Sequence, residues 1–331
     1  MTLVTGRATS GPLWRVVAVM TARRLVAGLL VLFAVSVVVF VATEIAPGDA
    51  ASASLGPDAG PAAIEARRAE LGLDRPAPLR YVEWLGGLFR GDLGVSYASG
   101  VPVADIVAAR AGNSLLLGGL AAVLLLPLAV VLGAWAGLRA GRLADRAVSK
   151  STLTLMSVPE FVTGTLLAVV FAVQLGWLPA VSFLPPGQSP LDRPEILVLP
   201  VITLLTVCLA HNTRVVRAGV AQSAVGEAAE SARLNGVVER RVVWRYILPA
   251  ALPPVVPLFA RYVTFLLGGA LIAETLFGYP GLASALVVAS ASRDVPVVQA
   301  VGLLAAAVTV LVNLAGDVVG TLLDPLRRVP R

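Results

Sequence analysis

The chain has 331 residues, of which 57% are hydrophobic and 14% are charged, and it contains one cysteine and one histidine. Soluble domains carry about 25% charged residues, so this composition indicates repeated passage through a lipid bilayer rather than one buried core. One cysteine and one histidine exclude a disulfide framework and argue against a zinc site. The net charge of +6 has two competing explanations, nucleic-acid binding and membrane topology.

Six apolar segments are long enough to cross a bilayer as helices, since a hydrocarbon core of about 30 Å requires roughly 20 helical residues. The first follows several arginines and is too long for a cleavable signal, so we expect it to be retained. The sequence therefore predicts an all-α integral membrane protein with about six transmembrane helices. The predicted spans are residues 25–45, 114–138, 152–175, 195–213, 252–273 and 298–322.

The loops differ in charge, which predicts their orientation. Residues 1–24, 139–151 and 214–250 and the C-terminal tail share one side of a six-span protein and carry most of the basic residues. By the positive-inside rule this side faces the cytoplasm, together with both termini. Topology thus explains the basic surplus, the expected contact is membrane lipid, and no nucleic-acid partner is needed.

Two segments are predicted to lie outside. Residues 46–112, between spans 1 and 2, mix helix-compatible stretches with Gly and Pro and place Tyr81, Trp84 and Phe89 where a folded excursion would rest at the membrane interface. A solvated loop with a few amphipathic turns fits this insertion equally well. The segment 274–299 begins with a turn at Gly278 and Pro280, followed by an apolar run too short to span. Such a run is typical of a re-entrant, pathway-lining element.

Ionisable residues in or beside predicted spans are candidates for a transport pathway, because charges are costly within a bilayer. They are Glu44, Glu160, Arg261, Glu274 and Asp317. Glu44 and Glu274 fall near external helix ends, where solvent is close, and helix-end solvation or ion pairing explains each member of this set better than a functional role does. With the external turn, they give these pathway or gate candidates: Arg261, Glu274, Gly278, Pro280 and Asp317.

Catalytic and nucleotide-binding patterns are missing from the sequence. It has no Gly-x-x-x-x-Gly-Lys-Ser/Thr loop, so we expect no ATP site on this chain. Ser114, Ser157 and Ser290 have no histidine partner, because His211 falls at the cytoplasmic end of a span, where it is interpreted as a packed residue. The sequence therefore predicts that the chain is not an enzyme and binds neither a cofactor nor a metal.

The cytoplasmic loop contains an unusually charged stretch, "EAAESARLNGVVERRVVWRYILPAALPPVVP", at residues 227–257. Its alanines favour a helix, and Gly236 interrupts it where a helix end takes a left-handed backbone. Val238, Val242 and Tyr246 form one row of a second short helix, with Val243 and Ile247 beside it. We therefore predict a helix–turn–helix on the cytoplasmic face. A basic amphipathic helix resting on anionic lipid is the alternative.

This stretch resembles the cytoplasmic signature of ABC importer membrane subunits, in particular the dipeptide/oligopeptide/nickel permease family. The signature is Glu-Ala-Ala, three residues, Gly, nine residues and Ile-x-Leu-Pro; here Glu230-Ser231-Ala232, Gly236 and Tyr246-Ile247-Leu248-Pro249 match its spacing, with departures at Ser231 and Tyr246. Further family-like blocks occur in order along nearly the whole chain: "IAPGD", "LGLDRP", "GDLGVS", "LGWLPA", "ETLFGYPGL", "RDVPVVQ" and "LLDPLRR".

The resemblance implies a permease subunit of an ATP-driven importer in the bacterial cytoplasmic membrane. It implies a cytoplasmic segment 1–24, a first span 25–45, an external insertion 46–112, a permease core 113–325, and a tail 326–331. Its partners would be a second homologous permease subunit, two ATPase subunits that carry ATP and Mg, and an external substrate-binding protein. The ATPase-coupling residues carried over or adjacent are Glu230, Ser231, Ala232, Gly236, Arg240 and Arg241.

Two other functions compete with an importer of peptides or a related small solute. An ion- or proton-coupled carrier acting without ATPases would require more titratable pairs within the membrane than these spans contain, and a membrane scaffold or receptor subunit would leave the re-entrant-like segment idle. Neither alternative explains the spacing around Gly236.

Overall fold

The computed structural model describes residues 13–46, 50–56, 59–185, 187–253 and 270–323, with the single positions 255, 259, 262 and 265. Within them every regular element is a helix, apart from one isolated bridge between Val95 and Pro102. The predicted fifth span lies largely outside the described residues, as do Arg261 and the tail 326–331. Asp317 lies on the last helix, but its side chain is also outside the description.

Four described helices are long and apolar enough to cross a bilayer: α1 (Leu13–Ile45), α5 (Val103–Gly137), α8 (Glu195–Ala224) and α15 (Val295–Leu323). They correspond to the first, second, fourth and sixth predicted spans. Two helices extend beyond the predicted spans: α5 begins at Val103, ahead of residue 114, and α8 continues past residue 213. Polar helical turns at these ends lack the apolar run by which spans are recognised.

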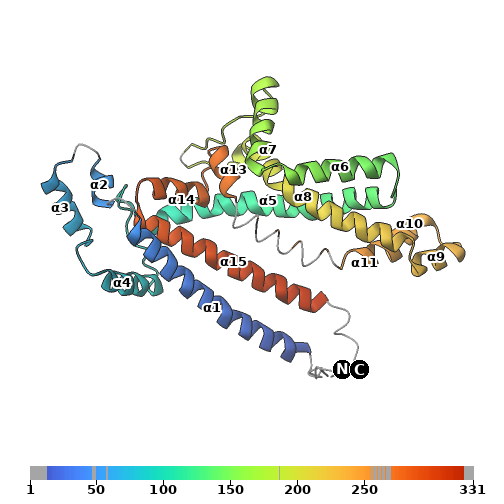
Figure 1. Cartoon of the computed structure of the whole chain (residues 1–331), viewed down its shortest axis with the longest axis horizontal. Coiled ribbons are helices and arrows are strands. Elements are labelled where there is room, and N and C mark those ends of the chain that lie inside the picture. Colours follow the sequence, from blue (N-terminus) through green and yellow to red (C-terminus); the bar gives the residue numbers. More distant parts are fainter. Residues whose placement is uncertain are drawn as a thin grey trace.

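The predicted third span, 152–175, is not one continuous helix. Helix α6 (Leu143–Ser157) is followed by α7 (Glu160–Leu167) and a π-helical turn (Ala168–Gln174), and the pair is bent by 109°. The break occurs at Pro159, where Val158 has an extended backbone (φ −92°, ψ 128°). Proline disfavours a helical backbone in the preceding residue, so the two helices part there. Figure 1 shows α7 turned away from α6.

The long helices pack in two pairs. Helix α1 lies beside α15, and α5 packs along α8 (Figure 1). Gly133 and Gly137 of α5 form a GxxxG pair facing α8: an added Cβ at Gly133 would lie 2.6 Å from Cβ of Val216, and one at Gly137 would lie 2.8 Å from the carbonyl oxygen of Arg217. Small residues at this spacing allow two helix backbones to approach closely. Helices α5 and α8 therefore form one rigid unit, which we call the strut.

The predicted external insertion and the predicted cytoplasmic segment lie at opposite ends of this strut (Figure 1). The insertion contains α2 (Ala50–Leu55), α3 (Pro61–Glu70) and α4 (Ala77–Phe89). Tyr81 of α4 packs edge-to-face against Phe40 of α1, and Trp84 packs against the same ring in a tilted arrangement, with ring centroids 5.1 and 6.3 Å apart. These two aromatic residues therefore fix the insertion to the first span, whereas Phe89 is 84% exposed.

Candidate functional site

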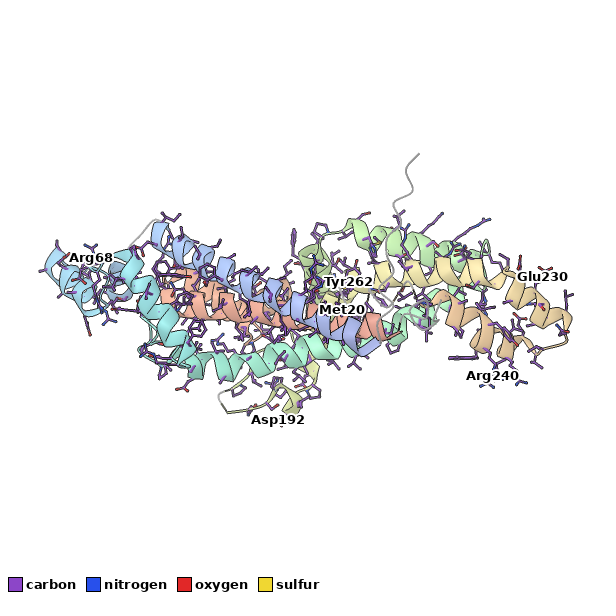
Figure 2. All side chains as sticks on the ribbon, turned by 90° about the horizontal axis from the view of Figure 1, so that it is seen from below. Met20, Arg68, Asp192, Glu230, Arg240 and Tyr262 are labelled. Atoms are coloured by element: carbon purple, nitrogen blue, oxygen red, sulfur yellow. The ribbon has the colours of Figure 1, made fainter. Side chains whose placement is uncertain are left out.

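The segment at the far end of α8 folds as two short helices around a glycine turn, as predicted. Helix α9 (Glu227–Leu234) precedes Gly236, and α10 (Glu239–Val242), a π-helical turn (η3, Val243–Ile247) and α11 (Leu248–Ala251) follow it. We call α9 through η3 the tip. Figure 2 shows Glu230 and Arg240 at this end of the molecule.

Gly236 closes α9 with a left-handed backbone, φ +74°. The amide of Val237 donates to the carbonyl of Ala232 (3.0 Å) and that of Gly236 to the carbonyl of Arg233 (2.9 Å), the hydrogen bonds of a Schellman motif. An added Cβ at Gly236 would meet nothing within 4 Å. The backbone conformation alone, rather than lack of space, therefore requires glycine.

The inner face of the tip packs on this chain's own helix α8. Its buried residues join those of α8 and α11 in one core: Val216, Val220, Ala229, Ala232, Val242, Ile247, Leu248, Ala251 and Val255. The sequence interpretation that Ala232 permits close approach to a partner therefore needs correction, because its close neighbours belong to this chain. Of the predicted row, Val242 is buried whereas Val238 and Tyr246 are exposed; of the two residues predicted beside it, Ile247 is buried and Val243 is partly buried.

The outer face of the tip is exposed and combines charge with large apolar side chains. Glu230, Ser231, Gly236, Arg240 and Arg241 all lie in solvent. Large apolar residues that were not among the predicted coupling residues are exposed as well: Leu234 (83% exposed), Val238 (73%) and Trp244 on the tip, and Val225 just before it. Apolar side chains gathered on an exposed surface mark a binding site for another protein. The sequence did contain a signal for this surface, namely large apolar residues within a strongly charged segment.

Arg233 of α9 links the tip to the end of α8 and to α10. Its guanidinium donates to both carboxylate oxygens of Glu239 (3.0 and 2.8 Å) and to the carbonyl of Ala224 at the end of α8 (2.6 Å). The hydrogen bond from Arg233 lowers the pKa of Glu239. An exposed ion pair contributes only about 0–1 kcal/mol, but these three bonds fix the angle between α8, α9 and α10.

A second fastening joins α6 to α8. The Arg217 guanidinium donates to the two oxygens of Asp145 at 2.7 and 2.6 Å, and the Gly141 amide donates to the same carboxylate at 2.8 Å. The Asp145 side chain is only 5% exposed. This bidentate pair holds the start of α6 beside α8 and above the tip's own core.

The turn predicted to be external, which we call the external turn, lies between α13 (Leu271–Leu276) and α14 (Leu282–Ala291), with Gly278 in a left-handed conformation, φ +61°. The prediction that Glu274 lies near solvent is wrong, because the residue is fully buried. Its carboxylate accepts from the Ser114 hydroxyl (2.6 Å) and from the amides of Ala283 (2.7 Å) and Ser284 (3.0 Å). It thus caps the first turn of α14, where the exposed amides and the helix dipole favour an anion.

The beginning of α5 holds this turn in place. The Asn113 side-chain amide donates to the carbonyl of Pro280, the Tyr279 hydroxyl donates to the carbonyl of Asn113 (both 2.9 Å), and the Leu282 amide donates to the Ser114 hydroxyl oxygen (2.8 Å). The pathway candidates Glu274 and Pro280 therefore sit in a buried hydrogen-bond network that ties the turn to α5.

The described residues contain no group of three or more His, Cys, Asp or Glu side chains arranged to hold a metal ion. His211 packs against the ring of Tyr262, with centroids 5.6 Å apart.

Comparisons with known proteins agree with this architecture. Residues 129–329 match the family model described as binding-protein-dependent transport system inner membrane component, and residues 18–116 match the model of the N-terminal part of such membrane components. The glutathione transport system permease protein GsiC of Escherichia coli is 35% identical over 310 residues, and the oligopeptide transport system permease protein AppB of Bacillus subtilis is 30% identical over 306. Each alignment covers 92% of this chain and 97% of the relative. The chain belongs to the family of inner membrane components of binding-protein-dependent ABC transport systems.

Proposed function

We propose that this chain forms half of the translocation pathway of an ATP-driven importer for peptides or a related small solute. Two relatives, similar over nearly their whole length, are named for oligopeptide and glutathione transport. A component of this family is a permease subunit rather than an enzyme. The work of ATP then comes from two partner ATPase subunits that bind ATP and Mg. A second permease subunit completes the pathway, and an external binding protein delivers the solute.

The observation that carries the proposal is the outer face of the tip. It is a compact, internally fastened element with exposed Leu234 and Val238 beside charged Glu230, Arg240 and Arg241. A solvated loop would not keep such apolar side chains in water, and a protein interface combines an apolar centre with a polar rim. An importer of this kind lies in the cytoplasmic membrane of a bacterial cell. The tip and both termini would then face the cytoplasm, where the ATPase subunits are, and the insertion would face outward.

A continuous set of contacts connects the tip with the external turn. The tip shares a core with α8, α8 packs on α5 through Gly133 and Gly137, and α5 binds the turn through Asn113 and Ser114. Rigid helices in close contact move as one body, so a shift imposed on the tip would displace the external turn. This is the means by which ATPase closure would change access to the pathway.

The test is Leu234→Asp in the transporter reconstituted with its partner subunits. A carboxylate at the centre of the docking face should abolish co-purification of the ATPase subunits and ATP-dependent peptide uptake, because an unpaired charge is costly to bury. The matched control is Leu143→Asp, on the same predicted side of the membrane and 82% exposed, which should change neither. Uptake driven by a proton gradient in the absence of ATPase subunits would instead establish a coupled carrier.

A further inference from the structure

Helix α4 (Ala77–Phe89) attaches the insertion to the first span, near the end of α1 that is far from the N-terminus (Figure 1). Its inner face carries Tyr81 and Trp84, whose rings pack against Phe40 of α1. The hydroxyl groups of Tyr81 and Ser36 also share a hydrogen bond of 2.9 Å. Phe40 and Ser36 therefore define the level along α1 at which α4 is held.

This level lies within the apolar run of α1. The helix has no charged residue between Arg24 and Glu44, so the hydrocarbon core of the bilayer ends near Glu44 on this side. Phe40 and Ser36 precede Glu44 by four and eight residues, which is about 6 and 12 Å along an α-helix. The inner face of α4 therefore contacts side chains that lie below the polar boundary of the membrane.

A second face of α4 is apolar and exposed. Leu79, Val82 and Phe89 all lie on the surface, and Gly86 falls between the last two. The spacing of three, four and three residues from Leu79 to Phe89 aligns these positions along one face of the helix. We call Leu79, Val82 and Phe89 the outer stripe. Because Tyr81 and Trp84 occupy the face toward α1, the stripe does not contribute to that attachment.

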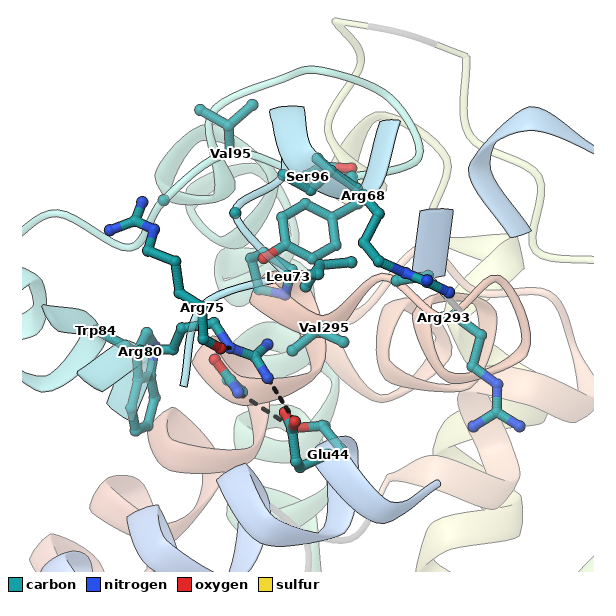
Figure 3. A pocket seen from close by; sticks show the side chains of 18 of the residues that line it. Glu44, Arg68, Leu73, Arg75, Arg80, Trp84, Val95, Ser96, Arg293 and Val295 are labelled. Carbon is teal, nitrogen blue, oxygen red and sulfur yellow. Dashed lines mark hydrogen bonds and ion pairs between the residues drawn. The ribbon is translucent and has the colours of Figure 1, made fainter. Parts of the chain in front are cut away.

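The charged residues of α4 lie on another flank. Arg80 pairs with Glu44, a contact drawn in Figure 3, and Arg80 and Glu83 line a cavity of about 670 Å³ between the insertion and the start of α15. The residues of the outer stripe do not line this cavity. The charged flank thus faces the aqueous end of α1, and the apolar stripe points elsewhere. Such a division is typical of helices that lie in the plane of a membrane interface.

The surface of α1 at the level of α4 is also apolar. Val37, Val38 and Val41 are exposed there. In a membrane component of this family, exposed apolar side chains at this depth of a span face lipid. The outer stripe therefore continues an apolar surface that already belongs to the bilayer, which favours lipid over a protein as its partner.

We propose that α4 is an interfacial helix whose outer stripe inserts into the lipid of the outer leaflet. Acyl chains just beneath the headgroups cover Leu79, Val82 and Phe89, while the charged flank stays in water. The insertion is thereby anchored twice, to α1 by its inner face and to the bilayer by the stripe, and the anchor holds the cavity at the membrane surface. The choice of leaflet rests on the proposed orientation, whereas insertion into lipid rests on the geometry of α4.

The test measures which quencher reaches a fluorescent label on the outer stripe. Because Cys208 is the one cysteine of the chain and is buried, Cys208→Ala gives a background for one new labelled cysteine at a time. The complete transporter is reconstituted in vesicles, with phosphatidylcholine brominated on its acyl chains as one quencher and iodide in the buffer as the other. Val82→Cys is compared with Val38→Cys on α1, since both positions are 65% exposed. Glu65→Cys on α3 provides the aqueous control, because that side chain is 71% exposed.

Brominated lipid should quench the label at position 82 as strongly as the label at position 38. Bromine near the headgroup should quench it more than bromine near the chain end, because an interfacial helix inserts only about 5–10 Å. Iodide should quench position 65 and spare position 82, since an ion is excluded from hydrocarbon. Strong iodide quenching at position 82 without quenching by brominated lipid would overturn the proposal. Protection of position 82 from both quenchers would also overturn it and would assign the stripe to a protein partner.

These measurements need neither ATP nor uptake, so failure of the import function would appear separately, as normal quenching without transport. The orientation has its own readout. A membrane-impermeant thiol reagent added outside right-side-out vesicles should modify position 65 only if the insertion is external. Absence of that modification would move the stripe to the other leaflet without changing its contact with lipid.

Discussion

Replacing Gly236 tests whether the left-handed turn shapes the tip. At φ +74° an L-residue brings its Cβ close to its own backbone, at a cost of roughly 1–2 kcal/mol. No other atom lies within 4 Å of the added Cβ, so Gly236→Ala isolates this backbone cost. A loss of 1–2 kcal/mol corresponds to about 5- to 30-fold more frequent opening of the tip.

Hydrogen exchange provides the assay for this substitution. The Val237 amide, which closes the motif on the carbonyl of Ala232, should exchange about 5- to 30-fold faster in Gly236→Ala. Gly236→Asn should stay close to the wild type, because asparagine tolerates this conformation. Gly236→Pro fixes φ near −65°, so the turn cannot form and both ATPase assembly and uptake should be lost. Unchanged exchange in the alanine variant, or normal uptake by the proline variant, would refute the reasoning.

Three further predictions follow from the contacts. Gly133→Leu should lower the free energy of thermal unfolding of the detergent-solubilised protein by about 1–3 kcal/mol, because the added side chain would overlap α8. Gly119→Ala is the control and should be neutral, since no atom lies within 4 Å of its added Cβ. Equal effects of the two substitutions would contradict the close packing of α5 on α8. Glu274→Gln should lower the free energy of thermal unfolding by about 1–2 kcal/mol, because a neutral side chain makes weaker hydrogen bonds to the first amides of α14. A variant that unfolds at the same temperature as the wild type would contradict the capping role of Glu274. The hydrogen bond from Arg233 lowers the pKa of Glu239, so it stabilises the tip fully above the ordinary glutamate pKa and is lost as pH falls through the lowered pKa. The protection of the tip amides, measured relative to their intrinsic exchange rates, should therefore fall only once the pH is below the ordinary glutamate pKa, and Glu239→Gln should abolish that step; a protection factor that does not change with pH in the wild type would contradict the role of the pair.

The sequence was sufficient for the class of fold and for the position of the tip. Long apolar runs identify α1, α5, α8 and α15, because their length follows from bilayer thickness. Gly236 was identified correctly as a left-handed helix end, since its place between two helical patterns leaves few other roles.

Other features depended on tertiary contacts that no local pattern contains. The break in the third predicted span is different, because Pro159 gives a local signal for it by disfavouring a helical backbone at Val158. In the second short helix the periodicity placed Tyr246 and Ile247 near the same row, and only packing against α8 decides that Ile247 is the buried one. The role of Glu274 depends on Ser114, 160 residues earlier in the chain. The cavity beside the insertion likewise forms only when the insertion folds against the start of α15.

The central claim is that the tip receives the ATPase subunits on the side of the membrane opposite to the insertion. A photo-crosslinking amino acid at Leu234 tests it most directly, with the same group at Phe89, which is equally exposed at the other end. Irradiation of the complete transporter should join position 234 to an ATPase subunit and position 89 to none. A crosslink between position 89 and an ATPase subunit, or no ATPase crosslink from position 234, would contradict the account.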